Sequence, residues 1–341
     1  MSATPTASDS RPTGTAGALP RARSVVDWLT RSIGGVGLGL LFVLALEIVI
    51  FTSQSEFFLE ADNLKNVGRA MTIVGIAAIG QTIVIIAGGF DLSIGSVMAA
   101  AGILSAYLIS HGLPFGVGIA GALVLGCAIG MFNGAVVAYM RINPLIATLA
   151  TLAMVRGLAF VITGGQAEVV TSQTYLDLGT NDFAGIPLVV ILLVVLFLAV
   201  GFTIPRTRFG RYMYAIGSNA RAARLAGVRT RRWRLVFFAL SGTFAAIAGC
   251  VTVSRTGTAE PSANIGAELD VITAVILGGT SLAGGRGRLV GTFLGLLVIA
   301  VLNNGLILLQ VPSYWQQVVK GGVLLGAVAW DELRRTRRDV E

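Results

Sequence analysis

The sequence Pro205-Arg-Thr-Arg-Phe-Gly-Arg-Tyr-Met-Tyr-Ala-Ile-Gly-Ser-Asn-Ala-Arg-Ala-Ala-Arg-Leu-Ala-Gly-Val-Arg-Thr-Arg-Arg-Trp-Arg234 carries nine arginines and no acidic residue. It lies between two apolar runs, 186–204 and 235–253, each long enough to cross a bilayer. Because cytoplasmic loops of membrane proteins carry an excess of Lys and Arg, this stretch predicts a cytoplasmic loop and sets the orientation of the chain. We expect a cytoplasmic partner to bind here.

The composition is that of an integral membrane protein. Hydrophobic residues make up 55% of the 341 residues and charged residues 12%, and the mean hydropathy is +0.81. Soluble domains are roughly one quarter charged. Because a spanning segment must satisfy its backbone groups without water, the long uncharged runs predict an all-α membrane protein rather than a barrel.

The apolar runs predict about ten transmembrane helices. These are 33–52, 70–88, 93–110, 115–138, 144–163, 186–204, 235–253, 269–284, 289–310 and 316–330. With residues 205–234 inside, alternation places both termini in the cytoplasm. We therefore predict a basic, disordered cytoplasmic tail over 1–32, a membrane domain over 33–330 and a cytoplasmic tail over 331–341.

The predicted outer loops are acidic, which agrees with this orientation. They contain Glu56, Glu60, Asp62, Glu168, Asp177, Asp182, Glu260, Glu268 and Asp270. The net charge of +8 then reflects membrane topology, since most of the surplus lies on one side. We expect a bilayer as the surroundings of the chain and no nucleic acid as a partner.

The sequence shows no constellation for catalysis, metal binding or nucleotide binding. Its one histidine is His111, and Cys127 and Cys250 fall in predicted spans, where they are expected to pack. The two lysines, Lys65 and Lys320, do not follow glycine as the lysine of a phosphate-binding loop does. We expect no enzyme activity and no cofactor in this chain.

Three ionisable residues in or beside the predicted spans leave an ion-driven transporter open as an alternative. They are Glu47, Asp91 and Arg156, and such groups are costly in a membrane and often functional. Arg156 could instead pair with backbone carbonyls or with Glu47. Asp91 could instead bond the N–H groups that open the next helix.

A short helix is predicted inside the arginine-rich stretch. Asn219 is a good N-cap, the alanine-rich residues 220–226 favour helix, and Gly227 suits the residue that ends one. Ala222, Leu225 and Ala226 share an apolar face. The stretch could bind anionic lipid, but the caps and this face favour a groove on a protein.

Two further patterns bear on the fold. Asn133-Gly134 with Pro144 resembles Asn304-Gly305 with Pro312, five spans later, which suggests an inverted repeat of the kind transporters use. Residues 278–288 are too rich in glycine for a regular helix. They are either a cytoplasmic turn or part of a pathway.

Several motifs together resemble the permease subunits of ribose-type bacterial ABC sugar importers. They are Gly89-Phe-Asp-Leu-Ser93, Asn143-Pro-Leu-Ile-Ala-Thr-Leu-Ala-Thr151, Arg208-Phe-Gly-Arg-Tyr212, Ala215-Ile-Gly217, Ala222-Ala-Arg-Leu-Ala-Gly227 and Gly278-Gly-Thr-Ser-Leu-Ala-Gly-Gly285. The resemblance covers about residues 35–330 in the order of the family. The long N-terminal tail departs from it.

The resemblance implies an inner-membrane permease that imports a monosaccharide, ribose or a similar solute, by alternating access. Its partners would be a second permease subunit, usually identical, a cytoplasmic ATPase that binds the ATP and Mg²⁺, and a periplasmic or lipid-anchored sugar-binding protein. The ATPase would contact the loop through Arg208, Phe209, Gly210, Arg211, Ala215, Gly217, Asn219, Ala222, Ala223, Leu225, Ala226 and Gly227. Candidate pathway residues are Gln81, Phe90, Asp91, Asn133, Asn143 and Thr148.

Overall fold

The computed structural model describes residues 25–339, and side chains from residue 36 to residue 333. Most of the predicted N-terminal tail and the last two residues lie outside the described residues. The helices are α1 (Val25–Gln54), α2 (Ala61–Ile86), α3 (Ile94–Ser110), α4 (Phe115–Ala135), η1 (Val136–Met140), α5 (Pro144–Thr163), α6 (Gln173–Thr180), α7 (Leu188–Arg206), α8 (Arg208–Leu225), α9 (Thr230–Thr256), α10 (Ala267–Leu277), α11 (Leu289–Leu308) and α12 (Ser313–Asp339).

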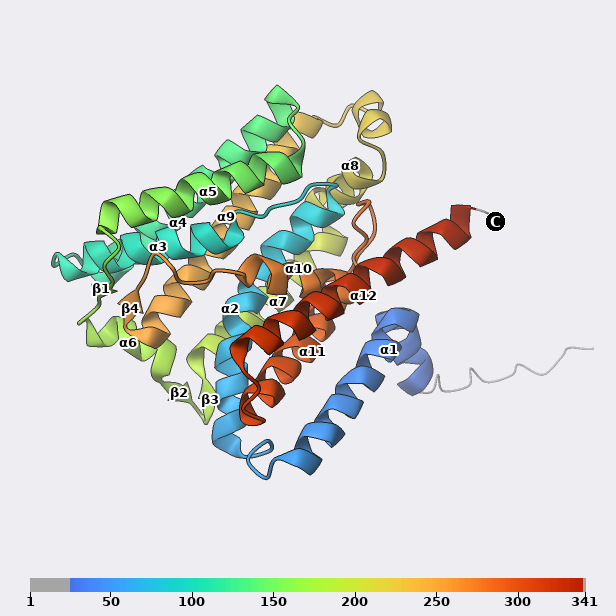
Figure 1. Ribbon diagram of the computed structural model, residues 1–341. Coiled ribbons are helices and arrows are strands. Elements are labelled where there is room, and N and C mark those ends of the chain that lie inside the picture. Colours follow the sequence, from blue (N-terminus) through green and yellow to red (C-terminus); the bar gives the residue numbers. More distant parts are fainter. Residues whose placement is uncertain (1–24, 340–341) are drawn as a thin grey trace, which may run out of the picture.

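Four strands of two residues each form the only sheets in the described part of the chain. The pair β1 (Glu168–Val169) and β4 (Thr258–Ala259) is antiparallel, and so is the pair β2 (Asp182–Phe183) and β3 (Ile186–Pro187). Both pairs tie together connections at one end of the helices (Figure 1). The protein is therefore all-α in its membrane part, as predicted.

Each of the ten predicted spans contains a helix, but the prediction of a full span over 269–284 is wrong. Helix α10 has 11 residues, which at about 1.5 Å per residue is roughly half of a 30 Å hydrocarbon core. The helix ends because Gly279 adopts a positive φ angle, and the N–H of Thr280 donates back to the carbonyl of Val275 at 3.2 Å. Residues 278–288 form an irregular turn between α10 and α11.

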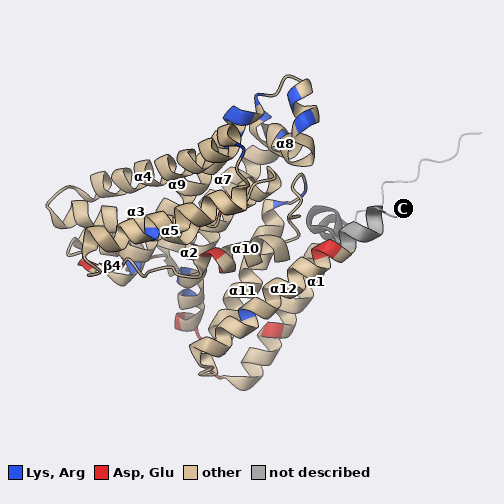
Figure 2. Ribbon diagram, turned by 45° about the horizontal axis from the view of Figure 1, so that its top comes forward, with Lys and Arg blue, Asp and Glu red and all other residues tan. Residues whose placement is uncertain are grey.

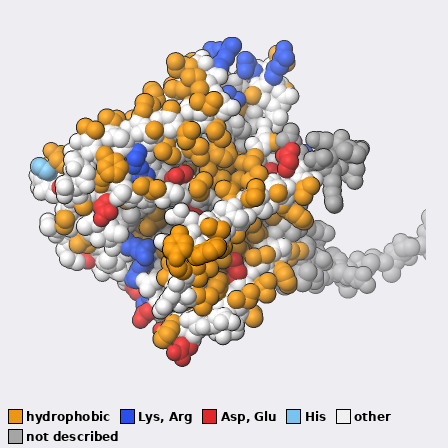
Figure 3. All heavy atoms as spheres, in the orientation of Figure 1, with side chains coloured by type: hydrophobic (Ala, Val, Ile, Leu, Met, Phe, Trp, Pro, Cys, Tyr) orange, Lys and Arg blue, Asp and Glu red, His pale blue; other side chains and the backbone are white. Residues whose placement is uncertain are grey.

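Seven described helices are long and apolar enough to cross a membrane. They are α1, α2, α4 with η1, α5, α7, α9 and α11. Large apolar side chains remain exposed on several of them, including Phe42, Val161 and Leu198. Hydrophobic side chains cover much of the face shown in Figure 3, whereas basic side chains gather over α8. This surface suits lipid contact rather than water.

Helices α2 and α9 form the centre of the bundle and pack against each other. Helix α3 contacts α4, α5 and α9, and α10 correspondingly contacts α11, α12 and α2. The two sets, α2 to α5 and α9 to α12, therefore have matching contacts around the central pair (Figure 1). The repeat predicted from the sequence pairs each span with the one five spans later, and these matching contacts agree with that pairing.

Glycines allow α4 and α9 to pack at close range. Gly126, Gly130 and Gly134 recur every four residues on α4, and a Cβ at any of them would collide with the backbone of α9. At Gly130 the collision would be with the carbonyl oxygen of Phe238. Small residues let membrane helices approach where no hydrophobic force drives them together.

We expect Gly130→Ala to destabilise the folded protein by about 1–3 kcal/mol, the usual cost of overpacking. A thermal unfolding curve in detergent measures the change. Gly116→Ala on the same helix is the control, because nothing lies within 4 Å of a Cβ at that position. Equal melting temperatures for the two variants would contradict the close packing at Gly130.

Candidate functional site

The arginine-rich loop folds as helix α8, which has a break in it. Asn219 has non-helical backbone angles (φ −158°, ψ 96°) and separates a longer first segment from a short second segment. Its Oδ1 accepts hydrogen bonds from the backbone N–H groups of Arg221 and Ala222, at 3.0 and 2.9 Å. The predicted N-cap is confirmed. The predicted helix over 220–226 is present as the second segment, although it continues directly from another helix.

The second segment also ends as the sequence predicts. Gly227 has φ +84°, and the N–H of Val228 donates to the carbonyl of Ala223 at 3.0 Å. This arrangement closes the last turn and favours glycine at its left-handed position. Residues 219–227 are hereafter called the capped helix.

The capped helix presents an apolar face outward. Ala223 is buried against the rest of the protein, whereas Ala222, Leu225 and Ala226 are exposed, and Leu225 is 86% accessible. Arg221 and Arg224 are exposed as well. Figure 2 shows basic residues grouped on α8 and at the start of α9. The capped helix therefore offers a small apolar patch with arginines beside it.

The first segment of α8 anchors the capped helix to the bundle. Met213 and Ile216 are buried, and the Phe209 ring meets those of Trp233 and Phe237 with centroids 6.0 and 5.4 Å apart. A Cβ at Gly210 would collide with the carbonyl of Ile204. Of the predicted coupling residues, Phe209, Gly210, Gly217 and Ala223 thus pack inward. The exposed ones are Arg208, Arg211, Ala215, Asn219, Ala222, Leu225, Ala226 and Gly227.

Helix α8 meets the end of α2 and the glycine-rich turn at Gly217. A Cβ there would collide with the carbonyl of Ile86, and Gly285 donates its N–H to that same carbonyl at 2.8 Å. The Tyr214 hydroxyl donates to the carbonyl of Gly287 at 2.8 Å. The arginine-rich loop is therefore in direct contact with the segment that leads into Phe90 and Asp91.

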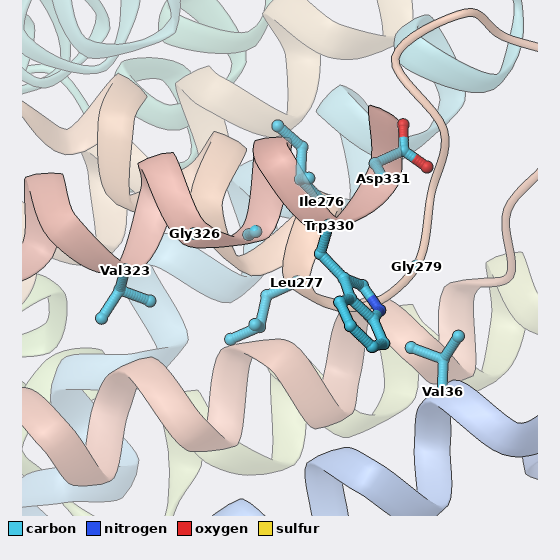
Figure 4. Close-up of a pocket in the computed structure, with 9 residues that line it drawn as sticks. Val36, Ile276, Leu277, Gly279, Val323, Gly326, Trp330 and Asp331 are labelled. Carbon is cyan, nitrogen blue, oxygen red and sulfur yellow. The ribbon is translucent and has the colours of Figure 1, made fainter. Parts of the chain in front are cut away.

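The other side of the glycine-rich turn is held by α12. Asp331 accepts hydrogen bonds from the Ser281 hydroxyl at 3.2 Å and from the Leu282 N–H at 3.3 Å. A cavity of about 360 Å³ lies beside this turn, and in Figure 4 Trp330 reaches across it from α12 toward Val36 of α1. The turn is thus fixed from two sides, which favours its reading as a structural turn.

A buried hydrogen-bond network surrounds Asp91 in the connection between α2 and α3. Asp91 is 1% exposed, and its Oδ1 accepts from the Ser93 hydroxyl at 2.6 Å and the Ser93 N–H at 3.0 Å. Its Oδ2 accepts from the Ser241 hydroxyl of α9 at 2.8 Å. The expected bond to the start of the next helix is present, since Ser93 directly precedes α3.

The network continues into α4 and α5. Asn133 donates to the Ser93 hydroxyl at 2.9 Å and accepts from the Thr151 hydroxyl at 2.6 Å. Thr148 accepts from the N–H of Leu92 at 3.0 Å. Four helices, α3, α4, α5 and α9, therefore converge on one polar cluster.

The predicted pathway residues fall into two groups. Phe90, Asp91, Asn133 and Thr148 lie in or next to the network. Asn143 instead caps α5 by accepting the N–H of Leu145 at 2.9 Å, and Gln81 is fully buried in α2 with no hydrogen-bond partner in the described part of the chain. Sequence reasoning missed Ser93, Thr151 and Ser241. Ser93 and Thr151 end two of the quoted motifs, which was a usable signal.

The Arg156 side chain is held by backbone carbonyls of the segment that precedes α10. Its Nη1 donates to the carbonyls of Pro261 and Ala263 at 2.6 and 2.7 Å, which confirms the interpretation that it pairs with backbone carbonyls. Glu47 is not its partner. One carboxylate oxygen of Glu47 is buried without a hydrogen-bond partner among the described residues.

An all-α bundle with a basic cytoplasmic-type loop and a buried polar network is the arrangement of a multi-pass membrane transporter. Residues 63–328 match the family described as branched-chain amino acid transport system / permease component. The chain belongs to this permease family and is a multi-pass protein of the inner membrane.

Curated relatives are similar over most of the chain. The ribose import permease protein of Escherichia coli K12 is 40% identical over 299 residues, covering 86% of this chain and 93% of its own length. The ribose import permease protein of Bacillus subtilis 168 is 41% identical over 300 residues, covering 86% and 92%. The L-arabinose ABC transporter permease protein of Azospirillum brasilense is 36% identical over 294 residues, covering 85% and 87%.

Proposed function

We propose that this chain is the permease subunit of an ATP-binding-cassette importer and moves a monosaccharide, ribose or a similar sugar, across the inner membrane. The similarity to ribose and L-arabinose permeases along nearly the whole chain carries this proposal. ATP and Mg²⁺ are bound by a separate ATPase subunit. This assignment agrees with a sequence in which neither lysine follows glycine as in a phosphate-binding loop.

The capped helix is the contact for that ATPase. Its exposed Ala222, Leu225 and Ala226 would fill an apolar groove, and Arg221 and Arg224 would face acidic groups at the edge of the groove. A short helix gains little stability alone in water, so its two caps matter for presenting this face. The N-cap and the glycine at the C-terminal end both fix its position relative to the bundle.

Transport proceeds by alternating access. A loaded binding protein docks on the acidic outer loops, and ATP binding closes the ATPase pair and moves α8. Because Gly217 of α8 touches Ile86 and Gly285, that motion reaches the end of α2 and the connection that carries Asp91. A partner shifts a conformational equilibrium only by its different affinity for the two states, so the ATPase must act through this contact.

The assembled importer contains two permease subunits, which we propose are identical copies. The binding protein delivers the sugar from the periplasm, either free or anchored by a lipid. Exposed apolar side chains on α1, α5 and α7 leave ample surface for a second subunit and for lipid.

An ion-driven secondary transporter is the alternative function. The unpaired carboxylate oxygen of Glu47 is the observation that favours it. Arg156 bonds to carbonyls and Asp91 bonds to hydroxyl and N–H groups, so two of the three candidate coupling residues already have structural partners.

An uptake assay distinguishes the two proposed functions. It uses proteoliposomes that contain the permease, its ATPase and the binding protein. We expect D-ribose uptake to require ATP and the binding protein and to continue after ionophores collapse the proton and sodium gradients. Uptake that needs no ATP and stops with the ionophores would establish the ion-driven alternative.

A further inference from the structure

A pocket lined by both polar and apolar residues lies at the end of the bundle opposite α8. It is formed by the first turns of α2, the last turn of α9 and the C-terminal half of α11, and it has a volume of about 440 Å³. Small-molecule sites in proteins range from roughly 300 to 1,000 Å³. None of the residues predicted from the sequence as pathway residues lines this pocket.

The polar lining contains both donors and acceptors. Four asparagines, Asn63, Asn66, Asn303 and Asn304, share the pocket with Arg255. Asn63 and Asn304 exchange two hydrogen bonds, at 3.0 and 2.8 Å, and so satisfy each other. Asn66 is exposed at the pocket, and no hydrogen bond joins its side-chain amide to another described residue.

Arg255 is also without a partner in the described part of the chain. It is partly buried, and neither a hydrogen bond nor an ion pair joins it to another described residue. The neighbouring cation, Arg69, is in an ion pair with Asp182 at 2.6 Å. The pocket thus holds an unused guanidinium donor and an unused carbonyl acceptor.

We propose that this pocket binds the transported sugar on its way across the membrane, an inference that rests on the proposed function. A hydroxyl group both donates and accepts, so a neutral polyhydroxyl solute can bond both Arg255 and the Asn66 amide. An anion would accept from Arg255 but could not donate to the Asn66 carbonyl, and Arg255 repels a cation. The apolar residues Val74, Leu296 and Ile299 of the lining suit the C–H face of a sugar ring.

The position fits this role. The pocket is at the end where the proposed binding protein would release its sugar, with the capped helix at the other end (Figure 1). Arg255 lies in the last turn of α9, one of the two central helices. Ser241 of the same helix donates a hydrogen bond to Asp91. The pocket and the Asp91 network are therefore built on the same helix.

The test uses the complete importer in proteoliposomes and measures sugar taken up per ATP hydrolysed, with D-ribose, L-arabinose and D-allose as probes. We expect Arg255→Gln and Asn66→Ala each to lower this ratio about three- to tenfold, since each removes one hydrogen bond to the solute. ATP hydrolysis should stay at the wild-type rate, and the order of preference among the three sugars should change. Because Arg255 bonds no other described residue, Arg255→Gln breaks no hydrogen bond or ion pair of the described fold.

The control is Asn181→Ala, which removes an exposed amide outside the pocket and should leave the ratio unchanged. Unchanged sugar per ATP in both pocket variants would overturn the pocket assignment while leaving the proposed function intact. A parallel loss of uptake and hydrolysis, with sugar preference unchanged, would show a structural role and also overturn it. If the wild-type importer transports none of the three sugars, the proposed function and this inference both fail.

Discussion

Leu225→Asp should abolish ATP-dependent uptake while the permease remains folded and inserted. Leu225 is 86% accessible, so a carboxylate there costs the isolated permease little. In the groove of an ATPase the same change loses about 1.5–3 kcal/mol of apolar burial. It also places an unpaired charge in an interface, which costs several kcal/mol more. Uptake into proteoliposomes and the amount of inserted protein are the two measurements.

Leu333→Asp is the matched control for this prediction. Leu333 is an exposed leucine at the far end of α12, 61% accessible, and lies outside the capped helix. We expect it to leave uptake near the wild-type level. Gly227→Pro should reproduce the loss seen with Leu225→Asp, because proline cannot adopt φ +84° and the helix end would unwind. Normal uptake in both capped-helix variants would show that the coupling role is wrong.

Asp91→Leu should produce the largest loss of stability. The change removes the acceptor for three buried donors, the Ser93 N–H, the Ser93 hydroxyl and the Ser241 hydroxyl. Each buried donor left without a partner costs about 1–3 kcal/mol, so the free energy of unfolding should fall by about 3 kcal/mol or more. At roughly 2 °C per kcal/mol, the melting temperature in detergent should drop by about 6 °C or more.

Asp91→Asn is the comparison for Asp91→Leu, because it removes the charge and keeps the hydrogen-bonding groups. The amide oxygen can still accept from Ser93, and its NH₂ group can donate to the Ser241 oxygen, so the network keeps its connections. We expect stability close to that of the wild type and continued ATP-driven uptake. An Asp91→Asn protein that melts normally but no longer transports would contradict a structural role and would favour ion coupling through Asp91.

Much of the bundle is predictable because its determinants are local. Long apolar runs, the arginines of 205–234 and the capping residues Asn219 and Gly227 each predict a structure that depends on neighbours in the sequence. The short length of α10 was missed because the uncharged sequence continues past Leu277, whereas the helical backbone conformation ends there. Positive φ at Gly279, two residues after the end of the helix, decides that boundary.

The candidate site could be predicted only in part, since its contacts are distant in the sequence. Asp91 and Asn133 were identified as polar groups near spans, but their connection through Ser93 depends on how α3 packs on α4. Gly217 contacts Ile86 across more than a hundred residues, and no periodicity shows such a contact. The pocket beside Arg255 likewise exists only once α2, α9 and α11 are packed.

The central claim is that ATP energy enters this permease through the capped helix, and site-specific cross-linking tests it most directly. A photo-reactive amino acid in place of Leu225 should cross-link to the ATPase subunit in the assembled importer. The same amino acid in place of Leu198, which is 68% accessible on the membrane-spanning α7, should not. Cross-linking of position 225 to lipid alone, with none to the ATPase, would contradict the account.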